Sequence, residues 1–594
     1  MTNTIRHIFT AVMTFLLLGF QIQAQNNAPL ADDIIFKALT DELTRSSNDL
    51  VLNNYQPPFY VSYQLYDIKT LLIKATLGTI RQVQENPVRS SNIRLMVGDY
   101  NLNDENFSGQ TPLMTVSNYL PVPLENDYDG IRRAFWISTD RLYKSSLQRY
   151  EQKLTALKQQ NKTDGEQIDD FTKAAPLTYI SKEPDFKIDR AKWENVAREV
   201  SAVFNAYGDI SASTTTIFVV KAWTYHVTSE GARIKFPVNI TALMVNAYTQ
   251  ANDGEPLTDH VLYFAPTPDQ LPSLEKMKLE ARQLADYMVT LRNAPALKES
   301  YAGPVIFEGN AVAELFSQKL FAPNAGLFAT REPVMAVERQ GYEQSSATKF
   351  DNRIGQKIIS PSISIKAISR TKTFNGIPLI GAFEIDAEGV TPPDELVLVQ
   401  NGILRTLLNG RVPTSKVKES NGHMRLVLNQ NGYPYSLKSP GVINISYQNG
   451  KPAASFKKHV LDEFAQNGLE YIYVIKKLQV PNTGMIGVMS TAANRNLSVS
   501  RPIVIYQVSA KTGEETLIRS AIINDFHMSA FKQIPGGTSE QVVYNTAVLK
   551  YGIIIPSTYI VPQALVFEDI NIEPDKGVTK AKLPVVPNPV LAVK

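Results

Sequence analysis

Residues 274–292 have the sequence LEKMKLEARQLADYMVTLR, and the apolar run GPVIF follows at residues 303–307. Apolar side chains recur in the first stretch at helical spacing, and Lys, Glu and Arg fill much of the rest, so we predict an amphipathic helix. Pro295 ends it, because proline cannot continue a helix. Beyond residue 300 the pattern changes to short apolar runs typical of strands, and we place a domain boundary there.

Both kinds of pattern occur before this boundary. Helical spacing predicts helices over residues 31–50, 132–162 and 191–206, and β-rich runs predict strands over residues 60–65, 71–80, 92–102, 214–227 and 234–249. Residues 25–300 are therefore expected to form an α+β domain.

Short strands dominate the second half. We predict a short helix over residues 310–321 and strands over residues 357–365, 395–399, 442–447, 471–478, 503–508 and 517–524. The dipeptide Asn401-Gly402 between two apolar runs indicates a hairpin turn. Residues 301–572 are thus expected to form a β-rich domain, so the predicted fold class is α+β. The Pro- and Lys-rich residues 573–594 are expected to form an extended or mobile tail.

The start of the chain is typical of a secretory signal peptide. Arg6 and His7 precede an apolar run over residues 8–20, and the small residue Ala24 follows. Residues 1–24 are therefore predicted to be a signal peptide of an exported, periplasmic protein. The alternative is a retained N-terminal anchor. The apolar run is too short and too early for a normal membrane span.

Composition excludes several classes of function. The 594 residues carry a net charge of only +3, without a run of like charges, which argues against a nucleic-acid partner. The sequence contains no Cys, so the chain has no disulfide, no thiolate metal ligand and no thiol nucleophile.

Six short segments carry a resemblance to a known family. They are TSEG at residues 228–231, GPVIF at 303–307, GQKIISP at 355–361, GAFEIDAEG at 381–389, NGILRTLLN at 401–409 and SNGHMR at 420–425. In order and spacing, over roughly residues 190–570, this series resembles the TldD/PmbA metallopeptidase family. The region before residue 190 matches weakly, and we interpret it as an elaboration of this lineage.

The resemblance implies a fold and an activity. The family has an α+β N-terminal domain and a β-rich C-terminal domain. Active members cleave unfolded peptides with a zinc ion. The ligands of this ion come from an H-E-x-x-x-H helix and a distant Cys. They act as a dimer with a related subunit that lacks the zinc motif, and the dimer encloses a cavity for an extended peptide.

The zinc motif of that family is absent from this chain. The matching helix reads AELFSQKLF at residues 313–321, so Phe316 and Phe321 stand at the two His positions and Ser317 stands at the Glu position. None of the six His in the sequence is followed by Glu, and no Cys is present. Catalysis by zinc needs three protein ligands and a base. We therefore expect no catalytic residue, no metal site and no cofactor.

Two other arrangements leave alternatives open. His423, His459 and His527 all lie in the C-terminal half, where they could form a different metal site or be separate structural residues. Asp386 and Glu388 could form an acid–base pair or fix the geometry of a turn. His226, on an expected strand, is interpreted as structural.

Three functional hypotheses follow. The first is a non-catalytic family member that pairs with a related TldD-type subunit, or with itself, and helps to handle unfolded peptides. The second is a stand-alone peptide-binding or scaffolding protein of the cell envelope. The third is an active metallopeptidase with a site of another kind. Residues predicted to contact a peptide are Phe316, Phe321, Ile403, Leu404 and Leu407.

Overall fold

The computed structural model describes residues 33–108, 122–160, 168–182, 185–322, 326–335, 350–428, 434–480, 499–549, 553–586, 588 and 589. The predicted signal peptide, residues 1–24, lies outside these residues. Among them, no helix is both long and apolar enough to cross a membrane.

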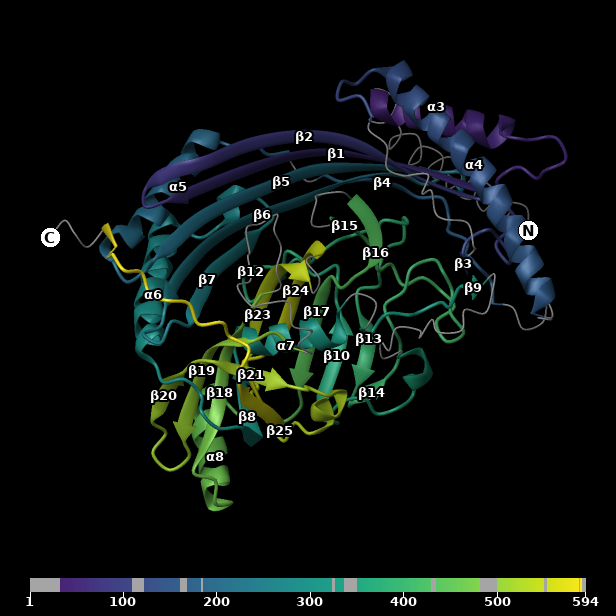
Figure 1. Ribbon diagram of the computed structural model, residues 1–594. Helices are drawn as coiled ribbons and strands as arrows, with labels where there is room; N and C mark the ends of the chain where they lie inside the picture. The colour runs from purple at the N-terminus through teal and green to yellow at the C-terminus, as the bar shows by residue number, and fades with distance from the viewer. Residues whose placement is uncertain are drawn as a thin grey trace, which may run out of the picture.

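A curved sheet of long strands forms the N-terminal part and arches over the rest of the molecule (Figure 1). Its order is β2-β1-β5-β6-β4, and β7 also pairs with β6. The strands are β1 (Tyr60–Thr76), β2 (Thr79–Met96), β4 (Thr178–Ile180), β5 (Ala212–Thr228), β6 (Arg233–Gln250) and β7 (Pro256–Ala265). The prediction of three strands between residues 60 and 102 was wrong. The chain forms two long strands, because both sides of the hairpin pair along their whole length.

Alternation along these strands separates two cores. Side chains of β1 and β5 alternate between the sheet's faces, since successive strand residues point to opposite sides. The odd-numbered apolar residues, such as Tyr63 and Ile217, face four helices. The even-numbered ones, such as Tyr66 and Phe218, face the C-terminal part instead. Both faces of the sheet are therefore covered.

The helices lie in two pairs at the two ends of the arch (Figure 1). One pair consists of α3 (Ile34–Asp49) and α4 (Tyr128–Gln159), and the other of α5 (Arg190–Ala202) and α6 (Leu274–Asn293). Asp33 begins α3 by accepting hydrogen bonds from two backbone N–H groups of its first turn. All four helices were predicted, and their bounds agree within a few residues, because each carries a clear apolar face.

Two sheets build the C-terminal part. The first has the order β14-β13-β10-β17-β24-β15-β16, with β23 on β24, and the second has the order β20-β19-β18-β8-β25-β21, with β22 on β25. Their bounds are β8 (Tyr301–Glu308), β10 (Ile363–Ala367), β13 (Leu396–Gln400), β14 (Ile403–Leu404), β15 (Met424–Leu428), β16 (Pro434–Lys438), β17 (Val442–Tyr447), β18 (Tyr471–Leu478), β19 (Pro502–Ser509), β20 (Glu515–Ile518), β21 (Ala521–Asn524), β22 (Gly536–Gly537), β23 (Gln541–Leu549), β24 (Ile553–Pro562) and β25 (Ala564–Pro574). The short pairs β3 (Phe107–Ser108) with β9 (Val334–Met335), and β11 (Thr373–Phe374) with β12 (Ile377–Pro378), lie outside these sheets.

Helix α7 (Asn310–Leu320) packs in one core with residues of both C-terminal sheets. Helix α8 (Ala453–Gln466) covers the other face of the second sheet and was not predicted. The strand predicted over residues 517–524 is two strands. Ser520 breaks it with a φ of 59°, and the halves pair with different neighbours. The strand predicted over residues 357–365 begins only at Ile363.

The C-terminal tail lies along the N-terminal part (Figure 1). Lys580 pairs with Asp253 at 2.7 Å, and the Ala581 N–H donates to the Gly254 carbonyl at 2.9 Å. A Cβ at Gly254 would lie 2.2 Å from the Ala581 oxygen, so only glycine fits there. These bonds attach the described residues of the tail to the N-terminal part.

Candidate functional site

The helix that matches the family's zinc helix is part of the hydrophobic core. Phe316 and Phe321 are both 0% exposed. The ring of Phe316 packs 5.1 Å from that of Phe531, and the ring of Phe321 packs 5.8 Å from that of Tyr559, measured between centroids. A phenyl ring offers no atom to zinc. The residues at these positions therefore do not fit the metal that the family implies.

The three C-terminal His lie on separate elements. His423 precedes β15, exposed His459 lies on α8, and His527 precedes the short helix Met528–Lys532. Across the described parts of the chain, no group of three or more His, Asp or Glu side chains could hold a metal ion.

His423 belongs to an arrangement that looks like a Ser–His–Asn triad. Its Nε2 lies 3.0 Å from the Ser369 hydroxyl, and its Nδ1 lies 2.8 Å from the Asn421 carbonyl oxygen. Ser369 and His423 are each only 1% exposed, and the Phe383 ring packs edge-on against the imidazole. Burial lowers the pKa of His423 to about 4. A nucleophile needs room for a carbonyl about 3–3.5 Å away. The buried Ser369 hydroxyl has no such room. These hydrogen bonds therefore serve to connect the loops that carry Ser369 and His423.

The predicted peptide contacts are largely buried. Phe316, Phe321, Leu404 and Leu407 are 0% exposed and belong to one core cluster. Only Ile403 is partly exposed. This corrects the prediction for the four buried residues, because apolar side chains of short strands and helices in a two-sheet core turn inward.

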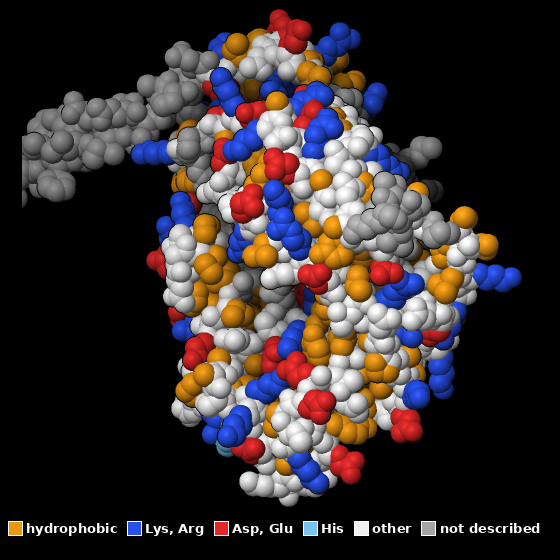
Figure 2. Space-filling model, turned by 90° about the vertical axis from the view of Figure 1, so that its left-hand side faces the viewer, with side chains coloured by type: hydrophobic (Ala, Val, Ile, Leu, Met, Phe, Trp, Pro, Cys, Tyr) orange, Lys and Arg blue, Asp and Glu red, His pale blue; other side chains and the backbone are white. Residues whose placement is uncertain are grey.

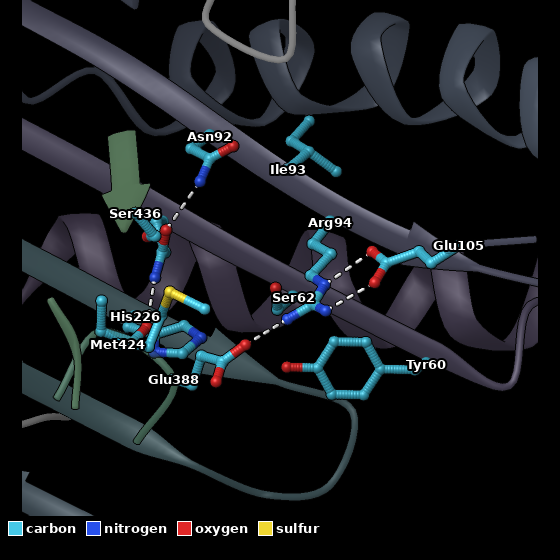
Figure 3. Close-up of a pocket in the computed structure, with 12 residues that line it drawn as sticks. Tyr60, Ser62, Asn92, Ile93, Arg94, Glu105, His226, Glu388, Met424 and Ser436 are labelled. Atoms are coloured by element: carbon cyan, nitrogen blue, oxygen red, sulfur yellow. Dashed lines mark hydrogen bonds and ion pairs between the residues drawn. The ribbon is translucent and has the colours of Figure 1, made fainter. Parts of the chain in front are cut away.

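A pocket of about 250 Å³ lies between the arched sheet and the C-terminal part (Figure 3). Residues of β1, β2 and β5 form its roof, and residues from the turn between β12 and β13 and from β15 and β16 form its floor. Strand register brings the roof together, since Gln64 lies opposite both Asn92 and His226, and Ser62 lies opposite Arg94. The lining comprises Tyr60, Ser62, Gln64, Asn92, Ile93, Arg94, Glu105, His226, Ala387, Glu388, Met424 and Ser436.

Ion pairs connect the two halves of the molecule at this pocket. The Arg94 guanidinium donates to both oxygens of Glu105, at 2.7 and 2.6 Å, and to Glu388 at 2.5 Å (Figure 3). The other oxygen of Glu388 accepts from the Arg411 backbone N–H at 2.6 Å. The Arg411 side chain in turn reaches Glu230 at 2.7 Å. Two segments of the family resemblance, at residues 228–231 and 381–389, therefore meet here.

Asp386 and Glu388 have different roles. Asp386 accepts hydrogen bonds from the backbone N–H groups of Glu388, Val390 and Met424, which confirms the turn-fixing interpretation for Asp386. Burial and the adjacent Glu388 raise the pKa of Asp386, although the three N–H donors act in the opposite direction. Glu388 instead extends into the pocket. The sequence placed both residues in one turn and could not tell that only one faces the N-terminal sheet.

His226 is buried beside these charges without a protein partner. It is 1% exposed, and neither ring nitrogen has a hydrogen bond within the described structure. Burial, followed by the charges of Arg411 and Arg94, lowers its pKa to about 3, so the imidazole is neutral. An unsatisfied buried polar group costs about 1–3 kcal/mol. No hydrogen bond of the described structure therefore supports the interpretation of His226 as a structural residue.

One face of the molecule is shown in Figure 2. Lys and Arg are interspersed with Asp and Glu on this face, and no continuous basic stripe crosses it.

Comparisons with known proteins agree with the resemblance. Residues 300–486 match the family model described as the PmbA/TldA metallopeptidase C-terminal domain. A search of curated proteins found no significant match.

Three solved structures share the fold. A protein described as a candidate modulator of DNA gyrase from Thermotoga maritima is 13% identical, covers 91% of this chain and 100% of its own, and gives a TM-score of 0.55. TldE from Thermococcus kodakarensis is 13% identical, covers 86% of this chain and 96% of its own, and gives a TM-score of 0.50. A protein described as a candidate modulator of DNA gyrase from Bacteroides thetaiotaomicron is 10% identical, covers 91% of this chain and 98% of its own, and gives a TM-score of 0.51.

These matches extend farther upstream than the sequence resemblance. Residues 190–594 make up only about two thirds of the chain, so a structural match over 91% must include much of the region before residue 190. The strands β1 and β2, which complete the arched sheet, lie there. Residues 300–486 are thus similar to the C-terminal domain of the PmbA/TldA metallopeptidase family, and the chain shares its overall fold with TldE and the two other solved structures.

Proposed function

We propose that this chain is a non-catalytic member of the family that binds an unfolded peptide as the partner of a zinc-bearing relative. The observation that carries the proposal is the replacement of both His positions by Phe316 and Phe321, whose rings complete the core between two sheets. A metal site must stay open to water and substrate. Rings packed in this way leave no such opening at these two positions.

Strand edges provide a means of holding a peptide. Strand β2 ends the order of the arched sheet, and most side chains of residues 81–87 are exposed. An extended peptide can add to such an edge through backbone hydrogen bonds, which are independent of side-chain sequence. This mode suits the capture of unfolded chains.

Export is part of the same proposal. The predicted signal peptide at residues 1–24 would deliver the chain to the periplasm, where it would meet a zinc-bearing relative and unfolded peptides. Support comes from the charged start, the short apolar run and Ala24 in the sequence.

The purified protein is expected to contain less than about 0.1 zinc per chain, well below the single ion of a mononuclear site. The reason is that Phe stands at both His positions and the chain has no Cys. The measurement is elemental analysis of mature protein prepared without chelators and without a His-tag. A value near one zinc per chain would contradict the proposal and favour an active metallopeptidase with another site.

The tagged protein, recovered from its native envelope, is expected to bring down a related subunit with an intact H-E-x-x-x-H motif. Mass spectrometry of the recovered complex identifies the subunit. A stable lone monomer or homodimer would contradict the partnership and favour the stand-alone peptide-binding protein. A matched sample of the untagged strain controls for unspecific capture.

A further inference from the structure

The pocket between the arched sheet and the C-terminal part is built for a ligand with hydrogen-bond donors. Its lining supplies acceptors: the carboxylates of Glu105 and Glu388, the hydroxyl oxygens of Ser62 and Ser436, and a ring nitrogen of neutral His226. His226 has no hydrogen-bond partner in the described structure although it is 99% buried. A donor from a ligand would satisfy it.

Charged side chains of both signs line the pocket. Two carboxylates, Glu105 and Glu388, face one guanidinium, that of Arg94. The charged groups packed around this lining have other partners. Arg411 pairs with Glu230, Asp386 accepts three backbone N–H groups, and Lys438 donates to the Ala329 carbonyl. The pocket wall itself therefore carries one more negative than positive group.

The size of the pocket limits the ligand. Sites for drug-sized molecules enclose roughly 300–1,000 Å³, whereas this pocket measures about 250 Å³. It has room for one amino-acid residue with its terminal group. Hydroxyl groups of Ser62 and Ser436 line the same space and can donate to a carbonyl oxygen.

We propose that this pocket receives the free amino terminus of a bound peptide, with the ammonium group donating to Glu388 and His226. The inference rests on the proposed peptide-binding function and adds the direction in which the bound peptide runs. A peptide held by its amino terminus would extend from the pocket in one direction. A lysine side chain carries the same ammonium group, so the test must separate these two sources.

The test compares the binding of three fluorescent decapeptides to the full mature chain. Two of them are free of lysine, and the third carries one lysine. One has a free amino terminus, one is acetylated, and one is acetylated but carries an internal lysine. Acetylation is expected to weaken binding by about tenfold or more, because it removes a charge-assisted hydrogen bond. The internal lysine is expected not to restore binding. Equal binding of the first two peptides overturns the pocket assignment but leaves peptide binding intact, and restoration by lysine overturns the assignment to the amino terminus.

A small probe makes the outcome independent of peptide binding. Alaninamide and its N-acetyl derivative are titrated calorimetrically against the same protein. Binding of alaninamide alone supports the pocket even where no decapeptide binds, a result that would overturn the proposed function only. Failure of both alaninamide and the free-amine decapeptide to bind overturns the pocket assignment.

His226→Leu provides the matched variant. Leucine is apolar and similar in size, and His226 makes no hydrogen bond within the described structure, so the melting temperature is expected not to fall. The preference for the free over the acetylated peptide is expected to shrink toward one. The control, His459→Leu on the exposed face of α8, should leave both quantities unchanged. A clear fall in melting temperature for His226→Leu, with an unchanged preference, would overturn the proposed role.

Discussion

Replacement of Arg411 by Met is expected to lower the free energy of unfolding by about 3–5 kcal/mol, because it breaks a buried ion pair and leaves a carboxylate behind. The Arg411 side chain is 1% exposed and donates to Glu230 and to the Thr172 carbonyl. Its guanidinium also lies 4.0 Å from the centre of the Phe171 ring. Met can replace the packing of the stem but none of these donors.

Tryptophan fluorescence and circular dichroism together measure this loss. All three Trp, at positions 136, 193 and 223, lie before residue 300, so fluorescence follows the N-terminal part during urea unfolding. Circular dichroism follows the whole chain. Arg411 joins the two parts, so the two transitions are expected to separate in the variant, which is the sign of lost cooperativity.

Arg370→Met is the matched control for this experiment. Arg370 likewise forms ion pairs, with Glu384 and Asp394, but its side chain is 39% exposed. Exposed pairs contribute about 0–1 kcal/mol, because water screens them. Equal losses in the two variants would contradict the claim that the buried cluster holds the two parts together. A double variant that also carries Glu230→Gln should lose less than the sum of the single losses.

Replacement of Phe316 by Ala is expected to cost about 3–5 kcal/mol of stability, the usual range for a buried Phe. The ring is 0% exposed in a core shared by α7 and both C-terminal sheets, and it contacts Phe531 edge-on. Its removal leaves a cavity that neighbouring strands cannot close without losing their pairing. Urea unfolding followed by circular dichroism measures the change in midpoint.

Leu279→Ala on α6 is the control, because that side chain is 51% exposed and also lies on a helix. Its effect should stay within about 0.5 kcal/mol. A loss below about 1 kcal/mol for Phe316→Ala would show that the position is not a fixed part of the core. It would also weaken the structural argument that the position matching a zinc ligand of the family serves stability in this chain.

The sequence by itself located helices α3 to α7, but not α8, and established that the zinc motif is absent. Periodicity located α3, α4, α5 and α6, because each has one apolar and one charged face. The absence of Cys and of any His followed by Glu is a property of composition, and no fold can reverse it. The short segments from residue 228 onward were also enough to indicate the family, which the match over residues 300–486 supports.

Only the tertiary structure decided which polar residues share a site. Arg94, His226 and Glu388 are far apart in sequence and meet because the register of β1, β2 and β5 aligns their even-numbered faces over one turn of the C-terminal part. Local patterns report which side of a strand a residue takes, but not what lies opposite that side. The sequence failed to predict the burial of Phe316 and Leu404 for the same reason. The packing of α7 with two sheets, set by contacts distant in sequence, turned these predicted peptide contacts into core.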